Sequence, residues 1–323
     1  MAGTLPASDR FGNPQVTCES INTRGTEMAI EVANGPVSWG VDRPDMPGAP
    51  PWQEVFDEIS EAGYRLCELG PPGFLPDDND RVRVELASRG LGVAGSYIFE
   101  PMHDRDRHED INKTTEKTCQ RIAALDGKFL VVIDMVSDER GATAGRSDAA
   151  TRLDGKDYEV LLSGIRQASA IAVKHGLTPV LHQHCGTYVE FEDEVERILA
   201  DTLDDGLQLC IDTGHFIYAG VEPVRFFAEH RDRTAYLHLK DINPVVHQKV
   251  LGDGVAFFDA ISLGIFCPVG QGMVDFGALA KALEDGFDGP ATIEQDRDFR
   301  ATTTALEDAK ASLDYLRGIG IAN

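Results

Sequence analysis

Four polar motifs in the second half of the sequence carry side chains that can bind a divalent metal ion. Each follows a short apolar run, and they read His182-Gln183-His184, Asp212-Thr213-Gly214-His215, His238-Leu239-Lys240-Asp241 and Glu294-Gln295-Asp296. Imidazole nitrogen together with carboxylate oxygen suits Mn²⁺, Co²⁺, Mg²⁺ or Zn²⁺. We therefore predict a metal centre whose ligands are His182, Asp212, His238 and Glu294.

Each of these residues also has a purely structural interpretation. A single histidine at the end of a strand is more often hydrogen-bonded than metal-bound, Asp212 could cap a following helix, and Glu294 could pair with a lysine. The coincidence of such residues on four successive strands favours the metal interpretation. His184 shares a strand face with His182, because side chains alternate along a strand, so either histidine is a candidate ligand.

Further residues near the ends of predicted strands are candidates for catalysis or substrate binding. Glu68 precedes a Gly-Pro-Pro-Gly turn, where an acidic side chain needs a partner, which could be an Arg or Lys of a neighbouring loop. Trp39 could form a wall for a sugar or cyclitol ring, or plug the barrel. Lys240 and Asp241 could support the ligands or act in catalysis, although Lys240 could equally be a surface lysine.

The polar motifs need a scaffold, and the sequence alternates between strand-like and helix-like segments. Apolar runs with strand character occupy residues 37–39, 65–69, 91–99, 129–135, 178–184, 207–212, 235–240 and 291–294. Helical periodicity occurs at 51–63, near 80–89, and at 111–125, 157–176, 189–200, 223–230, 255–266, 276–286 and 305–320.

Strict alternation of strands and helices predicts a parallel sheet covered by helices. A doubly wound open sheet would carry a GxGxxG motif after its first strand, and this motif is absent there. Eight repeats in about 290 residues instead predict a single-domain (β/α)8 TIM barrel. We assign residues 1–27 to an N-terminal extension and residues 28–323 to the barrel, whose strand ends would bring the four motifs to one rim.

The composition narrows the classes of partner. The chain has 323 residues with 54 Asp and Glu against 30 Lys and Arg, which gives a formal net charge of −24. A field of this sign repels nucleic acid and anionic membrane surfaces. The sequence has no apolar stretch of about 18 residues, and its N-terminus lacks the apolar core of a secretory signal. We therefore expect a cytoplasmic protein that acts on a small molecule.

The motifs together resemble a known family of barrels. The runs that carry the resemblance are CELGPPGFLPDD, HQHCGTYVE, IDTGHFIYAG, HLKDI, GIFCPVGQGMVDF and IEQDRD. They are similar to the sugar phosphate isomerase/epimerase superfamily with its xylose isomerase-like TIM barrel, and most of all to the inosose dehydratase branch. The resemblance extends from about residue 30 to the C-terminus.

The resemblance implies a metal ion held by Glu, Asp, His and Glu from the late strands. Matched by motif, these positions are His182, Asp212, His238 and Glu294, and histidine at the first position is similar to the dehydratase branch. The resemblance also implies that His184 faces the substrate. The run IEQDRD departs from the EAEQDP that is usual in that branch, which leaves the identity of the substrate open.

The implied chemistry predicts a metal-dependent dehydratase that acts on a keto-cyclitol such as 2-keto-myo-inositol through an enolate, in inositol catabolism, with Mn²⁺ as the expected ion. We expect Glu294 and His184 as base and acid, with Glu68 and Lys240 as further catalytic candidates. The expected substrate-binding residues are Trp39, His103, His184, His215 and Asp241.

The same first proton transfer serves two alternative functions. One is a keto-sugar isomerase or epimerase, and the other is metal-dependent β-elimination on 3-keto-glycosides by a subunit of a C-glycoside-cleaving enzyme, which would need a second subunit. An apurinic-site endonuclease of the same superfamily would need more metal ligands and a basic face, which the net charge of −24 argues against. A non-catalytic binding protein would hold no metal. Homo-oligomers are common in the family, so we expect one here.

Overall fold

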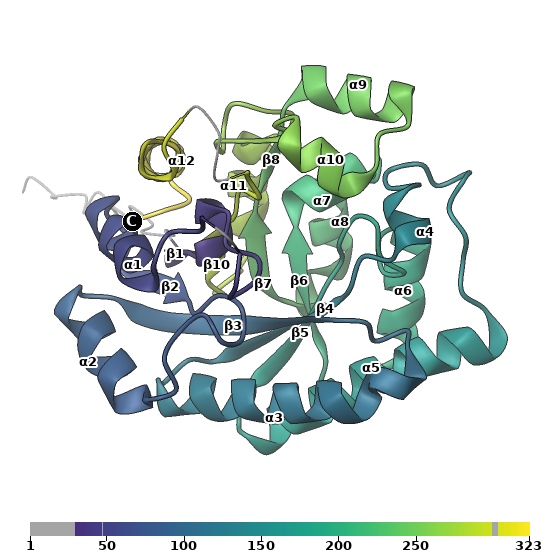
Figure 1. Cartoon of the computed structure of the whole chain (residues 1–323). Coiled ribbons are helices and arrows are strands. Elements are labelled where there is room, and N and C mark those ends of the chain that lie inside the picture. The colour runs from purple at the N-terminus through teal and green to yellow at the C-terminus, as the bar shows by residue number, and fades with distance from the viewer. Residues whose placement is uncertain (1–29, 47, 299–302) are drawn as a thin grey trace, which may run out of the picture.

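The structure is a computed structural model that describes residues 30–46, 48–298 and 303–323. Eight parallel strands close into a barrel in the order β1-β10-β7-β6-β5-β4-β3-β2, and helices surround it (Figure 1). The predicted (β/α)8 TIM barrel is therefore confirmed. The barrel strands are β1 (Val32–Asn34), β2 (Leu66–Glu68), β3 (Gly92–Glu100), β4 (Phe129–Asp134), β5 (Thr178–His182), β6 (Gln208–Asp212), β7 (Thr234–Leu239) and β10 (Ala291–Ile293).

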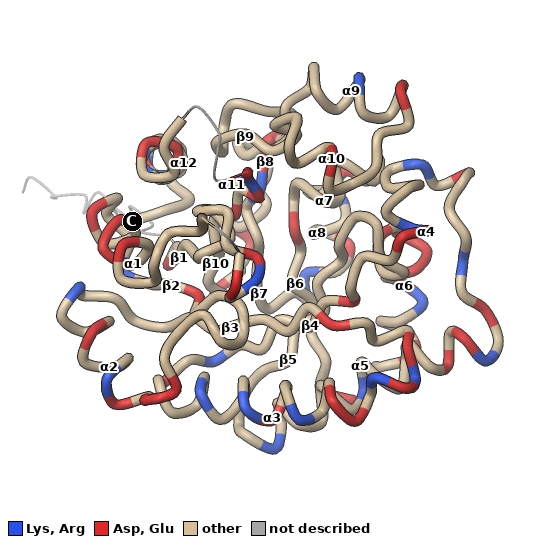
Figure 2. Tube along the Cα trace, viewed as in Figure 1, with Lys and Arg blue, Asp and Glu red and all other residues tan. Residues whose placement is uncertain are grey.

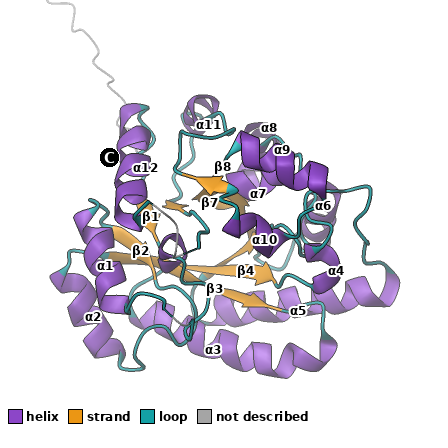
Figure 3. Ribbon diagram, turned by 45° about the horizontal axis from the view of Figure 1, so that its top comes forward, coloured by secondary structure: helices purple, strands orange, loops and turns teal. Residues whose placement is uncertain are grey.

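Helices cover the outside of the barrel, and the long ones lie where the periodicity predicts them (Figure 3). The helices are α1 (Trp52–Glu61), α2 (Asn79–Ser88), α3 (His108–Ala124), α4 (Asp138–Gly141), α5 (Gly155–Lys174), α6 (Glu192–Asp201), α7 (Thr213–Tyr218), α8 (Pro223–His230), α9 (Pro244–Asp253), α10 (Phe257–Ser262), α11 (Phe276–Leu283) and α12 (Ala305–Gly318). No helix was predicted at α4, α7 or α9, which follow strands as additions to the regular pattern.

The alternation of side chains along β4 explains how the barrel is filled and covered. Leu130 and Val132 belong to the large apolar cluster shared with the surrounding helices. Val131 and Ile133 belong to a separate cluster inside the barrel, which also contains Tyr236 of β7. Successive residues of a strand point to opposite faces, so one continuous apolar run supplies both layers.

The first predicted strand is wrong in its position. Residues 37–39 lie in a 3-10 helix, η1 (Pro36–Trp39), whereas the strand β1 precedes it at Val32–Asn34. Pro36 has its φ angle fixed by its ring and lacks an N–H, which suits the first turn of a helix better than a strand. Gly40 then ends the turn in the left-handed conformation, with a φ of 75°.

A second difference is an excursion between β7 and α11 that lies outside the barrel. The strands β8 (Asp241–Ile242) and β9 (Phe266–Cys267) form a small antiparallel pair, and α9 and α10 lie between them in the sequence. The periodicity predicts a helix over 255–266, but α10 covers only Phe257–Ser262. The excursion packs on its own apolar cluster, which includes Phe257, Ile265 and Phe266.

The two ends of the described barrel meet, because the backbone N–H of Ile30 donates to the carbonyl of Ile321 at 2.9 Å. The N-terminal extension predicted for residues 1–27 lies outside the described residues. Figure 2 shows acidic and basic residues interspersed along the outer helices. None of the described helices is long and apolar enough to cross a membrane.

Candidate active site

The four predicted metal ligands come from four strands that are neighbours in the barrel. His182 ends β5, Asp212 ends β6, His238 lies in β7, and Glu294 directly follows β10. In the registers Asp212 pairs with His238, whereas His182 pairs with Cys210 and His238 pairs with Thr292, each two residues before the next ligand. This stagger follows the tilt of the barrel strands and brings the four residues to one rim. Parallel strands present their carboxyl ends at one rim, which is why residues far apart in sequence meet here.

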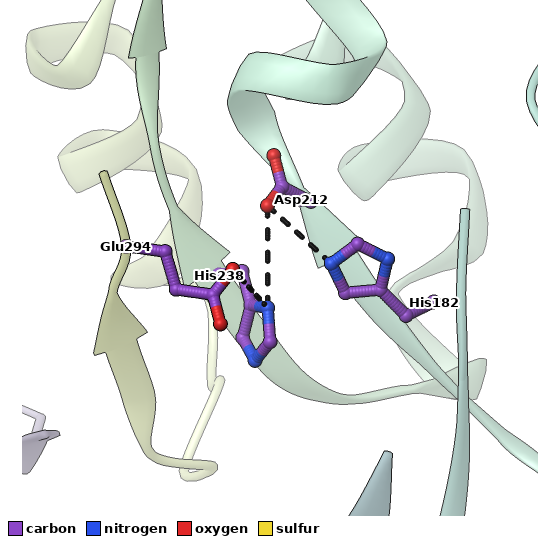
Figure 4. Close-up of side chains that lie close together, drawn as sticks. All are labelled: His182, Asp212, His238 and Glu294. Carbon is purple, nitrogen blue, oxygen red and sulfur yellow. Dashed lines mark ion pairs between the residues drawn. The ribbon is translucent and has the colours of Figure 1, made fainter. Parts of the chain in front are cut away.

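Ligand atoms of these four side chains all lie within 4.8 Å of one another (Figure 4). His182 Nε2 is 3.4 Å from Asp212 Oδ2, and His238 Nδ1 is 3.1 Å from Glu294 Oε2. The separation between His238 Nδ1 and Asp212 Oδ2 is 4.0 Å. Two ligands placed ~2.1 Å from one ion lie roughly 3.0–3.4 Å apart. The cluster therefore has nearly the dimensions of a coordination sphere.

Unpaired buried atoms support the same interpretation. Asp212 Oδ2, His238 Nδ1 and His182 Nδ1 are buried and make no hydrogen bond with the described residues. Buried polar groups are normally paired, and a buried charge is costly unless it is compensated. Three carboxylates, those of Asp212, Glu294 and Asp296, lie 3.0–3.3 Å from the ammonium of Lys240, and a fourth buried carboxylate, that of Glu68, contacts His238. A divalent cation would offset this excess of negative charge.

Glu68 contacts His238 from the side opposite to the cluster. Its Oε1 accepts hydrogen bonds from His238 Nε2 at 3.0 Å, Tyr236 Oη at 2.9 Å and Thr292 Oγ1 at 3.1 Å. With its Nε2 proton directed to Glu68, the imidazole turns the lone pair of Nδ1 toward Asp212 and Glu294. Glu68 does not line the cavity above the cluster, so the structure places it as a positioning residue rather than a group that contacts substrate.

Replacing Glu68 with glutamine is expected to weaken binding of the divalent cation about 10- to 100-fold. The amide can still accept one hydrogen bond, but it lacks the negative charge that makes the imidazole of His238 a better ligand. Titration with Mn²⁺ followed by isothermal calorimetry measures the change. Glu100→Gln is the matched control, because Glu100 also ends a barrel strand but is half-buried beside Arg107. Equal affinities of Glu68→Gln and the unmodified chain would contradict the assignment.

Lys240 connects the ligand cluster to a second group of polar side chains. Its Nζ lies 3.3 Å from Asp212 Oδ2, 3.1 Å from Glu294 Oε2 and 3.0 Å from Asp296 Oδ1. Burial opposes the charge of Lys240, but Asp212, Asp296 and Glu294 raise its pKa well above the ordinary value. Lys240 is 1% exposed, so it is a buried cation and not a surface lysine.

The second group consists of His184, His215 and Asp296, whose ligand atoms also lie within 4.8 Å of one another. Burial lowers the pKa of His184 to about 3 and raises the pKa of Asp296 to about 6. His184 Nδ1 lies 2.9 Å from the carbonyl of Cys185, which fixes the Nε2 of the neutral ring as an acceptor. Of the two candidate histidines, His182 lies with Asp212, His238 and Glu294, whereas His184 lies with His215 and Asp296, so the geometry favours His182 as the ligand.

A cavity of about 220 Å³ opens above both groups. Its floor contains His182, His184, Lys240, Glu294 and Asp296. Its wall is largely apolar and is formed by Val37, Met46, Tyr97, Phe99, Ile133, Phe257, Phe258 and Ile261. These wall residues were not predicted, and Asp296 was named in the fourth polar motif without a role of its own. The alternation in β3 could have placed Tyr97 and Phe99 on one face, but not facing a cavity.

Three predicted substrate-binding residues lie elsewhere than expected. Trp39 is 4% exposed in the apolar core, and its Nε1 donates to Glu58 Oε2 at 2.6 Å, so it forms no cavity wall. His103 Nδ1 is 2.7 Å from Asp134 Oδ1, and His103 is not among the residues that line the cavity. His215 is buried behind the floor, with its Nε2 3.0 Å from Lys240 Nζ. These contacts are made by packing, which a strand-end position alone does not reveal.

Asp241 also has a structural rather than a substrate-binding environment. It is fully buried, and its carboxylate accepts the backbone N–H groups of Gly270, Gly272 and Val274 at 2.8–3.0 Å. The side chain therefore holds the loop that follows β9. The close approach of Gly272 is required, since a Cβ there would lie 2.3 Å from Asp241 Oδ1.

Replacing Asp241 with alanine is expected to lower the free energy of unfolding by about 1–3 kcal/mol, because the backbone N–H groups of Gly270, Gly272 and Val274 lose their acceptor. Cation content should not change, since Asp241 is outside the ligand cluster. Thermal or urea unfolding measures the first effect and elemental analysis the second. An Asp241→Ala chain of undiminished stability would show that the loop does not depend on this carboxylate.

The chain is similar in sequence and in fold to known barrel proteins. The family model described as xylose isomerase-like TIM barrel matches residues 56–319. An inosose dehydratase of Geobacillus kaustophilus is 30% identical over 299 residues, covering 90% of this chain and 95% of the relative. Among solved structures, the zinc-bound IolI protein has a TM-score of 0.70 at 15% identity, covering 90% of this chain and 98% of its own. A probable 3-DHS dehydratase of Bacillus anthracis has a TM-score of 0.67 at 15% identity. The match covers 89% of this chain and 99% of that protein.

Proposed function

The chain belongs to the xylose isomerase-like TIM barrel family, as its motifs indicated, and from this premise we propose that it is a metal-dependent dehydratase of a keto-cyclitol such as 2-keto-myo-inositol. The chain is an enzyme of the lyase or isomerase type with a sugar-like small-molecule substrate. The observation that carries the proposal is the buried cluster of His182, Asp212, His238 and Glu294 at the floor of a cavity.

The four cluster residues would hold the cation, with Mn²⁺ as the proposed ion. When bound, a divalent cation draws electron density from a ketone oxygen and so stabilises the negative charge of an enolate. Glu68 holds His238 in the required orientation through the hydrogen bond to Nε2. The buried floor excludes bulk water, which strengthens each of these electrostatic interactions.

Residues on the cavity floor are proposed to move the protons. Glu294 and the acceptor Nε2 of His184 both face the cavity, and one of them removes the proton from the carbon next to the ketone. The electron pair left behind forms the enolate, which then expels the hydroxyl group from the next carbon. Lys240, with Asp296 beside it, is the proposed donor of the proton that leaves with this hydroxyl as water.

An isomerase or epimerase would share the first proton transfer but return the proton to the substrate. The two outcomes are separated by one experiment, in which the purified chain is incubated with Mn²⁺ and 2-keto-myo-inositol. We expect an enone or dione absorbance to appear and water to be lost, as measured by ultraviolet spectroscopy and mass spectrometry. Exchange of the substrate proton in D₂O with no change of mass beyond deuterium would indicate an isomerase. No reaction, with the cation bound, would refute the proposal.

The homo-oligomer and the cytoplasmic location expected from the sequence remain predictions. Sedimentation of the purified chain would test the first.

A further inference from the structure

The loop that follows His184 is held from behind by a buried ion pair that the proposed mechanism does not use. Arg140 of α4 is 0% exposed, and Glu190 in the loop before α6 is 1% exposed. Arg140 Nη2 lies 3.2 Å from Glu190 Oε2, and its Nη1 lies 2.6 Å from Glu194 Oε1 of α6, the helix beside α4 in Figure 1. Stability alone gives little reason for such a pair, because apolar residues of similar size often serve as well.

Glu190 uses both of its carboxylate oxygens to hold backbone groups of two loops. Its Oε2 accepts the N–H of Gly186 at 3.0 Å, and its Oε1 accepts the N–H of Gly145 at 2.6 Å. Glu194 Oε2 in turn accepts the N–H groups of Glu190 and Phe191 at 2.9 and 3.0 Å. The charged groups therefore hold the loop after β5 at two points, one at Gly186 and one at the start of α6.

The point at Gly186 belongs to the turn of residues 184–187, which carries His184. The N–H of His184 donates to the carbonyl of Val189 at 2.9 Å, and Thr187 Oγ1 donates to the carbonyl of His184 at 2.8 Å. The carbonyl of Gly186 accepts the N–H of Ser137, directly before α4, at 3.2 Å. Both backbone polar groups of His184 are thus bonded within the loop, and the turn itself is fixed to α4 and Glu190.

The orientation of the His184 ring depends on the same turn. Its Nδ1 lies 2.9 Å from the carbonyl of Cys185, so Nε2 faces away from the turn. The ring centroid lies 5.1 Å from that of Phe99 and 5.0 Å from that of Phe257, which bound the ring without a hydrogen bond. A displacement of the turn would therefore carry Nε2 with it.

We propose that Glu190, with Arg140 as its counter-ion, is a positioning residue that holds His184 Nε2 within reach of the carbon-bound proton of the substrate. The inference rests on the proposed function, because that function makes His184 one of the groups that move protons. Glu190 does not line the cavity, so it acts through the turn and not on the substrate. A displacement of a reacting group by about 1 Å can lower a rate about 100-fold.

Glu190→Gln tests the proposal, because an amide has one acceptor oxygen and cannot accept both N–H groups. We expect kcat for dehydration of 2-keto-myo-inositol to fall about 100-fold. KM and the Mn²⁺ content should stay unchanged, because the hydrogen bonds of Glu190 go to Gly145, Gly186 and Arg140 and not to the metal cluster. Glu139→Gln is the matched control and should keep its kcat.

The control residue differs from Glu190 only where the proposal requires it. Glu139 precedes Arg140 in α4 and also contacts the loop after β5, but its carboxylate is exposed and accepts the side-chain hydroxyl of Tyr188 at 3.2 Å. It holds no backbone group of the turn. A loss of kcat in Glu139→Gln equal to that in Glu190→Gln would mean that any disturbance of α4 impairs the site, which would overturn the specific role of Glu190.

A double-mutant cycle separates positioning from a general loss of structure. We expect Glu190→Gln to have no further effect in a His184→Ala chain, whereas a loss of folded protein would lower turnover equally in both backgrounds. Thr187→Val removes the hydroxyl that bonds the carbonyl of His184, so it should show the same pattern. This variant decides the question if Glu190→Gln fails to fold. Unchanged kcat, or equal losses in the two backgrounds, would overturn the proposal.

The proposed function can fail separately from this inference. If the unmodified chain binds Mn²⁺ but does not dehydrate the ketone, the proposed function is refuted, and crystals of Glu190→Gln and Thr187→Val then test the positioning alone. A turn and an imidazole of His184 displaced from their places in the unmodified chain would support the role of Glu190. Unchanged positions of both would overturn it.

Discussion

Replacing Asp212 with asparagine is expected to abolish turnover and to weaken cation binding by more than about 100-fold. Asp212 has two separate tasks. Its Oδ1 accepts the N–H of His215 and caps α7, whereas its Oδ2 is buried without a hydrogen bond and faces His182 and His238. Asparagine can keep the cap with its carbonyl oxygen, but it removes the charge from the cluster. The fold should therefore survive while the metal centre is lost.

The measurement for Asp212→Asn is the cation content after dialysis, together with the rate of dehydration. Asp134→Asn is the matched control, because Asp134 is 1% exposed at the end of β4 and pairs with His103 outside the cluster. The control should retain the cation. An Asp212→Asn chain that holds one cation as tightly as the unmodified chain would show that Asp212 is not a ligand.

Replacing Lys240 with methionine is expected to lower kcat about 10²- to 10³-fold while the cation stays bound. Methionine has a similar length but no charge, so it leaves Glu294 and Asp296 without the ammonium 3.0–3.1 Å away. Loss of a positive charge should not weaken a cation site and should tighten it if anything, because the local potential becomes more negative.

Steady-state kinetics and elemental analysis of the same Lys240→Met preparation check this expectation. Lys249→Met is the control, since Lys249 lies on α9 and its side chain is 60% exposed. Loss of activity through loss of the cation would mean that Lys240 supports the fold of the site and not the reaction. Unchanged kcat would remove Lys240 from the proposed mechanism.

The sequence was sufficient to predict the barrel and to nominate the cluster, and the physical reason is the topology. In a parallel barrel, the end of every strand lies at the same rim, so four strand-end motifs such as those of His182 and Glu294 must converge. The side chain of His184 was harder to assign, because it shares a strand face with His182. Only the three-dimensional arrangement shows that it joins His215 and Asp296 instead.

The predictions for residues 37–39 and for Asp241 were wrong because each local sequence pattern is compatible with two different structures. Val37 and Trp39 have side chains common in strands, but Pro36 and Gly40 bound a 3-10 turn, and Trp39 finds its partner in Glu58 on α1. By its position after a strand, Asp241 is predicted to lie at the rim of the barrel. In the structure, its carboxylate oxygens accept backbone N–H groups from a loop about 30 residues later in the sequence. Such partners depend on how the chain folds back, which periodicity does not encode.

The apolar wall could not be predicted for a different reason. Tyr97, Phe99 and Ile133 are ordinary interior residues by type, and nothing in their spacing distinguishes a filled interior from a cavity wall. Phe258 follows Phe257 in a short helix of the excursion, which has no counterpart in the regular alternation of strands and helices.

The central claim is that one divalent cation is held by His182, Asp212, His238 and Glu294. Crystals grown with Mn²⁺ and measured at the manganese absorption edge test it most directly, because the anomalous signal locates the ion without reference to activity. The account predicts one peak, ~2.0–2.2 Å from ligand atoms of these four side chains. A peak among His184, His215 and Asp296 instead, or no peak at saturating Mn²⁺, would contradict it.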